Sequence, residues 1–191
     1  MSARGWAEAW LAMIGALRLA CGDRRGLAYF DVSEEGFWRS FRAAVLCYPL
    51  YLALLALRLT GAQWNKSGAA TILFVETISY VISWVAFPLL ILPVARAFGR
   101  ADRFFGFMVA YNWSQVPQSA LLVLIGVQRA AGLSSPSAAQ SVELIATVAL
   151  LVYEWYIARA ALATTSVQST LVVILDLVLG SMLGRITEAL Y

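Results

Sequence analysis

The sequence predicts an all-α integral membrane protein: a five-transmembrane-helix bundle with an N-terminal amphipathic surface helix. Of the 191 residues, 61% are hydrophobic and 13% are charged, whereas a soluble domain carries about 25% charged residues. The apolar residues also gather in runs of roughly 20, the length that a helix needs to cross about 30 Å of hydrocarbon. So little charge cannot coat a water-facing surface, and we therefore expect much of the chain to face lipid.

Residues 1–30 are predicted to form a cytoplasmic amphipathic helix and a polar link. Apolar side chains recur there every three or four residues, the period of one helix face; they are Trp6, Trp10, Met13, Ile14 and Leu17. Glu8 and Arg18 interrupt the apolar stretch, which argues against a signal peptide. Two interpretations stay open. The helix lies on the membrane surface with its tryptophans at the headgroups, or it packs on the cytoplasmic end of the bundle.

Aromatic and arginine side chains are expected to form a collar at headgroup level, where both residue types are enriched. Asp31 and Glu34 have the spacing of a capping box, which marks the start of a helix next to this collar. The predicted membrane-surface residues are Trp6, Trp10, Arg24, Arg25, Trp38 and Arg39.

Residues 31–191 are predicted to form the transmembrane domain. Its spans are expected at about 41–60, 71–95, 104–127, 142–163 and 169–186. Short polar segments separate them, including a turn at 61–68 and a serine-rich loop at 132–139. No internal repeat is visible, and an odd number of spans argues against a simple duplicated transporter.

The placement of basic residues predicts the orientation. Basic residues crowd the N-terminal segment, the link between spans two and three, and the turn between spans four and five; they are Arg4, Arg18, Arg24, Arg25, Arg39, Arg42, Arg96, Arg100, Arg103 and Arg159. The other side has only Arg58, Lys66, Arg129 and Arg185. The positive-inside rule therefore predicts that the N-terminus lies in the cytoplasm and the C-terminus outside. We expect the membrane to be an inner membrane. The run from Arg96 to Arg103 either fixes this topology or binds acidic lipid or an acidic partner.

Spans two to five carry ionisable and amide side chains where hydrocarbon is expected. An ionisable group at the centre of a membrane helix costs roughly 2.5–3.5 kcal/mol on insertion scales, so it usually has a reason to be there. Gln115, Glu154 and Asp176 fall at comparable depth when each residue rises about 1.5 Å along its helix. We predict a polar membrane-core cluster of Glu76, Asn112, Gln115, Glu154 and Asp176.

Gly180 and Gly184 share a helix face with Asp176, at intervals of four residues. Such a small-residue seam is predicted to let another helix approach closely, which would turn Asp176 into the bundle. Two interpretations of the polar cluster stay open. Paired carboxylates that share a proton would suit a proton or substrate site, whereas interhelical hydrogen bonds worth about 0.6 kcal/mol each would only hold helices together.

Several kinds of chemistry are excluded by composition. The chain has no histidine and two cysteines, Cys21 and Cys47. This argues against His-ligated haem and metal sites, Ser-His-Asp catalysis and a cysteine zinc cluster. No Gly-rich phosphate loop or basic nucleic-acid-binding face is present. We therefore expect no enzyme, no metal, no cofactor and no nucleic-acid partner.

An aromatic-x-x-x-Pro sequence, from Trp113 to Pro117, lies in the third predicted span. Together with the cytoplasmic N-terminal segment, the five closely spaced spans and the external C-terminus, it resembles the Yip family of Ypt/Rab-interacting-type membrane proteins, in its bacterial branch. The resemblance covers roughly residues 31–184. Asn112 stands where the family usually has glycine, and the acidic motif of the eukaryotic members is missing.

The resemblance implies a non-enzymatic, membrane-embedded scaffold or interaction partner. Its expected partners are the lipid bilayer, a second copy of the chain or another membrane protein complex. The alternative function is a small transporter or channel subunit that uses the carboxylate and amide side chains at mid-membrane.

Overall fold

The computed structural model describes the backbone of residues 3–191 and the side chains of residues 6–191. Arg4, counted above among the basic residues, lies outside the described side chains. The described chain is helical, and no strand occurs within residues 3–191. In chain order the elements are α1 (Ala3–Ala20), η1 (Arg24–Tyr29), α2 (Glu34–Ser40), α3 (Arg42–Arg58), α4 (Gly61–Ser67), α5 (Ala69–Ala97), η2 (Ala101–Arg103), α6 (Phe104–Ala130), α7 (Pro136–Ala161) and α8 (Ser166–Glu188).

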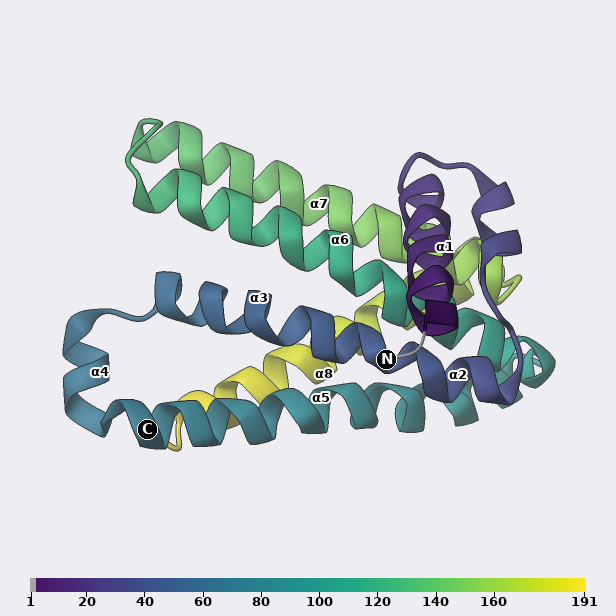
Figure 1. Ribbon diagram of the computed structural model, residues 1–191, viewed down its shortest axis with the longest axis horizontal. Coiled ribbons are helices and arrows are strands. Elements are labelled where there is room, and N and C mark those ends of the chain that lie inside the picture. Colours follow the sequence, from purple (N-terminus) through teal and green to yellow (C-terminus); the bar gives the residue numbers. More distant parts are fainter. Residues whose placement is uncertain (1–2) are drawn as a thin grey trace.

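The five long helices α3, α5, α6, α7 and α8 make up the body of the molecule, and the short elements gather at its two ends (Figure 1). α1 crosses one end, where it contacts η1, α6 and α7. We call this end, which also carries α2, the α1 end. The opposite end carries α4, the α6–α7 loop and the C-terminal end of α8, and we call it the α4 end.

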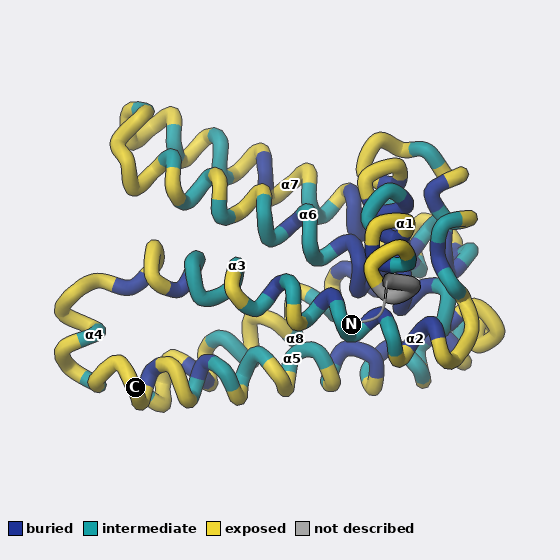
Figure 2. Tube along the Cα trace, viewed as in Figure 1, coloured by how far each residue is buried: buried dark blue, intermediate teal, exposed yellow. Residues whose placement is uncertain are grey.

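Four helices of the described chain are long and apolar enough to cross a membrane. They are Glu34–Arg58, Ala69–Ala97, Pro136–Ala161 and Ser166–Glu188. At most 28% of the most apolar stretch of each one is buried, and large side chains such as Phe74, Leu89 and Leu144 are exposed. Figure 2 shows that exposed residues recur along the long helices. Polar side chains such as Glu76 and Asn112 are buried instead. This arrangement reverses that of a soluble protein and fits a membrane protein surrounded by lipid.

α6 is the central helix and the most polar of the long ones. It contacts α1, α2, α3, α5 and α7, and every residue from Phe107 to Ser114 is buried. Its polar side chains Tyr111, Asn112 and Ser114 therefore face other helices rather than lipid. A helix sheltered in this way needs no continuous apolar surface, which explains why α6 has the length of a span without the composition of one.

α1 packs on the bundle through its small residues. Ala9, Ala12 and Ala16 are buried, and the backbones of Gly15 and Gly26 approach so closely that a Cβ atom on either glycine would lie within 3 Å of the other's carbonyl oxygen. Of the predicted apolar stripe, Trp6, Trp10 and Leu17 are exposed, whereas Met13 and Ile14 are partly buried. The helix therefore packs on the bundle end, as one of the two interpretations proposed, through its small residues and Leu19 rather than through its tryptophans.

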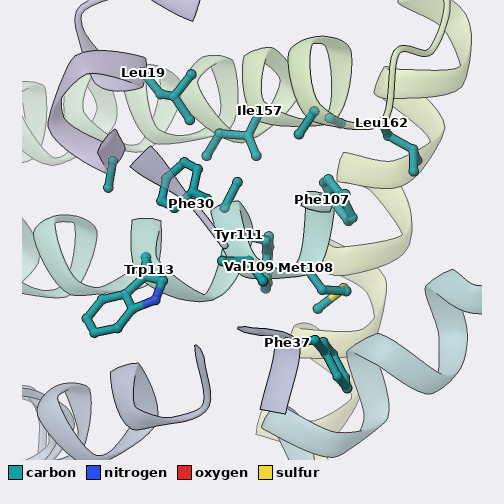
Figure 3. Close-up of a cluster of buried hydrophobic side chains, with 14 of the residues drawn as sticks. Leu19, Phe30, Phe37, Phe107, Met108, Val109, Tyr111, Trp113, Ile157 and Leu162 are labelled. Carbon is teal, nitrogen blue, oxygen red and sulfur yellow. The ribbon is translucent and has the colours of Figure 1, made fainter. Parts of the chain in front are cut away.

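Apolar side chains from α1, α2 and the long helices converge at the α1 end and form the main hydrophobic core cluster (Figure 3). They include Leu19 of α1, Phe37 of α2, Phe107 of α6 and Ile157 of α7. Burial of each such side chain contributes about 1.5–3 kcal/mol. This end is therefore a compact apolar plug under the polar part of the bundle.

The segment predicted as a polar turn at 61–68 forms the short helix α4 instead. A capping box starts it: the Thr60 hydroxyl accepts from the Gln63 backbone N–H, and the Gln63 side chain accepts from the Thr60 backbone N–H. This reciprocal pairing satisfies two N–H groups that a helix start otherwise leaves unpaired. The prediction of a turn was wrong because it relied on the glycines and polar residues of the segment and not on the capping box.

Candidate functional site

A groove runs between α3, α5, α6 and α8. It consists of two adjoining cavities of about 400 Å³ and 280 Å³. The cavities share six lining residues and are therefore continuous; these are Tyr51, Leu54, Tyr80, Ser83, Gly180 and Leu183. We call the two cavities together the groove. Its size is in the range of small-molecule sites, about 300–1,000 Å³.

One end of the groove reaches a carboxyl pair. Asp176 of α8 lines the groove, and the Tyr111 hydroxyl of α6 donates to Asp176 Oδ1 at 2.9 Å. Glu154 of α7 is a close neighbour of Asp176. Glu154 is 6% exposed, and its Oε1 atom has no hydrogen-bond partner among the described residues. A buried carboxyl oxygen without a partner is costly unless it holds a proton or a ligand.

The other end of the groove is built around Glu76 of α5, which is 2% exposed. The hydroxyls of Tyr51 and Tyr191 donate to its carboxylate, the latter at 2.5 Å, and Arg58 Nη2 lies 3.4 Å from Glu76 Oε1. Arg58 also pairs with Glu188 at 3.4 Å. Burial, followed by the neighbouring Glu76 carboxylate, raises the pKa of Tyr191 to about 12, so its hydroxyl keeps its proton and remains a donor.

The structure distributes the predicted membrane-core residues along the groove. Asp176 and Gln115 line it, and Glu154 is a close neighbour of Asp176. Asn112 also borders it, although its amide donates to Ser40 Oγ of α2 at 2.8 Å. Glu76 lies apart, seven residues or roughly 10 Å from the α4 end of its helix, whereas Glu154 lies equally close to the α1 end.

The predicted helix-packing seam has a different environment from the one expected. Gly180 and Gly184 line the groove, and a Cβ atom added to either glycine would meet no atom within 4 Å. No helix of the described chain therefore approaches them closely. The glycines widen the groove, and Asp176 faces the groove rather than a tight helix contact.

Tyrosine side chains of the groove were missed at the sequence level. The predicted polar cluster does not include Tyr51, Tyr80 and Tyr111, yet each hydroxyl hydrogen-bonds across helices. A partial signal was present, because Tyr111 lies four residues before Gln115 and thus on the same face of α6. What lies opposite that face depends on the tertiary fold.

A network of ion pairs joins α1 to α2 through Arg39. Its guanidinium pairs with Glu8 of α1 at 2.9 Å, with Glu35 at 2.7 Å and with Asp31. Three protein carboxylates therefore surround the guanidinium, and its predicted contact with the membrane surface stays a prediction. The other predicted surface residues are exposed, namely Trp6, Trp10, Arg24, Arg25 and Trp38.

Acid is expected to weaken this network through Asp31. Hydrogen bonds from Ser33, together with the charge of Arg39, hold the pKa of Asp31 below its ordinary value near 3.8. A lowered pKa in the folded state adds stability above the unfolded pKa, and this stability is lost as the pH falls through the folded pKa. Because Asp31 is partly exposed, we expect a loss of about 1 kcal/mol at most.

Thermal unfolding in detergent, measured from neutral pH to about pH 3, checks this expectation, because that range extends below the ordinary pKa of an aspartate. The Asp31→Asn variant should show a smaller loss of melting temperature on acidification than the wild type. An identical loss in both proteins would contradict this role of Asp31.

Comparisons of the chain with protein-family models, curated proteins and solved structures find no match. Function is therefore inferred from the side chains and their environment.

Proposed function

We propose that this chain is a five-span, bacterial inner-membrane protein that acts as a non-enzymatic scaffold, in the manner of the Yip family it resembles, and that its α1 end binds anionic lipid headgroups. The fifth span would be α6. Its 27 residues extend about 40 Å, enough to cross the hydrocarbon core, and its polar face is covered by other helices.

The observation that carries this proposal is a set of exposed tryptophans on a firmly held surface. Trp6 and Trp10 of α1 are 56% and 69% exposed, and Trp38 of α2 is 64% exposed. Tryptophan prefers the membrane–water interface, where its ring meets both lipid and water. The opposite face of α1 packs on the bundle through buried alanines. The tryptophan rings can therefore contact lipid without an entropic cost for ordering the helix.

Charge favours anionic lipid as the partner at this end. Arg24 and Arg25 lie exposed on η1, next to α1. Arg96, Arg100 and Arg103 are exposed on the link between α5 and α6, at the same end of the bundle. A basic residue near an anionic membrane surface contributes about 1 kcal/mol of binding.

Fluorescence in nanodiscs tests the lipid contact. We expect brominated phosphatidylglycerol to quench tryptophan emission more strongly than brominated phosphatidylcholine at the same mole fraction, because the arginines select anionic headgroups. The double variant Trp6→Phe and Trp10→Phe should lose most of this difference. Trp113→Phe is the control, since Trp113 is buried. A double variant that keeps the difference, or a wild type without one, would contradict lipid binding at this surface.

A second candidate function, a small transporter or channel subunit, is supported by the groove. Asp176 and Gln115 line a cavity rather than a dry helix interface, which is the arrangement that a transport site needs. Proteoliposomes under a pH gradient test it. Asp176→Asn and Glu154→Gln should each reduce proton or solute flux at least about tenfold if the carboxyl pair is essential to the path; unchanged fluxes in both variants would rule this function out.

A further inference from the structure

The carboxyl pair of Asp176 and Glu154, at the end of the groove nearer the α1 end, has no role in the proposed lipid binding. Two carboxyl groups side by side in a low-dielectric environment are stable when they share a proton or hold a cation. Glu154 Oε1 is buried and lacks a hydrogen-bond partner among the described residues. The described residues also contain no group of three His, Cys, Asp or Glu side chains that could hold a metal ion. A proton is therefore the ligand that fits.

A polar route leads from the α4 end to this pair. A surface cavity of about 230 Å³, bordered by Arg58, Glu188 and Tyr191, lies at that end. Arg58 also lines the groove, so the surface cavity and the groove adjoin. Hydroxyl and carboxylate side chains then line the groove as far as Asp176; in addition to Tyr51 they are Glu76, Ser79, Tyr80, Ser83 and Tyr111.

The side toward the α1 end is closed by apolar packing. One turn beyond Glu154, Ile157 and Ala158 of α7 are fully buried, as are Ala16 of α1 and Phe107 of α6 (Figure 3). Interiors packed in this way hold few voids large enough for water. A proton on the pair can therefore exchange with the α4 end, whereas the plug blocks exchange with the α1 end.

We propose that Asp176 and Glu154 share one exchangeable proton, which reaches them through the groove from the α4 end only. Tyr111 of α6 donates to the Asp176 carboxyl and orients it. The other titratable groups facing the groove near Asp176 are Cys47 and Tyr51 of α3 and Tyr80 of α5. None of these groups is basic, so no fixed cation of the described chain neutralises the pair.

This inference goes beyond the scaffold role. It uses the same residues as the second candidate function but does not require net transport, because a site open to one side would also serve a protein that responds to the pH of that side. A lipid-binding test that fails leaves it untouched, and so does a flux test that fails.

Cysteine accessibility tests the route, in a background with Cys21→Ser and Cys47→Ala. Gly180→Cys and Gly184→Cys place thiols in the groove, where a Cβ atom has open space. Met182→Cys, on the same helix but on its outward face, is the matched control. A membrane-impermeant thiol reagent attacks the thiolate, which forms only where water enters.

We expect both groove cysteines to react at least about tenfold faster than Met182→Cys when the reagent is added on the side of α4, and to be protected when it is added on the side of α1. Equal rates for Gly180→Cys and Met182→Cys would overturn the water-filled route. Equal reaction from both sides would overturn its one-sidedness.

A hydrophobic carbodiimide tests the proton itself, because this reagent attaches to the protonated carboxyl group. Peptide mass spectrometry of the full-length protein in liposomes should find an adduct on Glu154 or Asp176, and none on the exposed Glu188. Alkaline buffer on the side of α4 should reduce the adduct several-fold, and alkaline buffer on the side of α1 should not. No adduct on the pair, or protection by sodium or potassium ions at fixed pH, would overturn the assignment of a proton.

Discussion

Replacing Gly26 by alanine is expected to loosen α1 from the bundle and to lower the free energy of unfolding by about 1–3 kcal/mol, the usual cost of overpacking. Gly26 is buried in η1, and its added Cβ atom would lie 2.5 Å from the Gly15 carbonyl oxygen of α1. A backbone oxygen cannot move aside as the end of a flexible side chain can. Unfolding by a graded denaturing detergent, followed by circular dichroism, measures the loss.

Gly184→Ala is the matched control for this prediction. It makes the same chemical change within α8, but its Cβ atom would meet no atom within 4 Å. Alanine in place of glycine favours a helix by up to about 1 kcal/mol, so we expect unchanged or slightly higher stability. Equal destabilisation by Gly26→Ala and Gly184→Ala would show that the close approach of α1 and η1 does not exist in the protein.

Replacing Glu76 by alanine should destabilise the α4 end by about 1–3 kcal/mol, because it leaves buried donors unpaired. The hydroxyls of Tyr51 and Tyr191 both donate to Glu76, and Arg58 would keep only Glu188 as its partner. These contacts join α3, α5 and the last described residues. The same detergent titration checks this prediction.

Two further variants separate hydrogen bonding from charge at this position. Glu76→Gln keeps an acceptor oxygen and should recover at least half of the lost stability. Glu143→Ala removes the exposed partner of Arg129, a pair at 2.7 Å, and should cost about 1 kcal/mol or less, as exposed ion pairs do. A Glu76→Ala variant no less stable than Glu143→Ala would contradict a structural role for the buried carboxylate.

Much of the helical architecture could be predicted from apolar runs. The expected spans at 71–95 and 169–186 match α5 (Ala69–Ala97) and α8 (Ser166–Glu188) to within a few residues. Such runs are informative because every backbone group in lipid must be hydrogen-bonded within its own helix. α4 was missed because seven residues are too few to show a period, and its start depends on one capping box.

The environments of the candidate site residues could not be predicted in the same way. Spacing correctly placed Asp176 and Gly180 on one face of a helix, yet that face borders an open groove rather than a packed helix. Arg39 is an arginine next to aromatic residues, as a headgroup anchor is, but its guanidinium pairs with Glu8 of α1. Helix periodicity reports which side chains share a face, whereas the partner across that face depends on long-range packing.

The central claim is a bundle of five membrane-crossing helices that includes the polar helix α6. The most direct test of this claim is the location of the two chain ends. Reporter fusions in a bacterial host measure it, with green fluorescent protein active only in the cytoplasm and alkaline phosphatase active only outside it. If the chain crosses the membrane five times, green fluorescent protein fused to the N-terminus should fluoresce. Fused after Tyr191, green fluorescent protein should not fluoresce and alkaline phosphatase should be active. Fluorescence at both ends would mean an even number of crossings and would contradict the membrane-spanning role of α6.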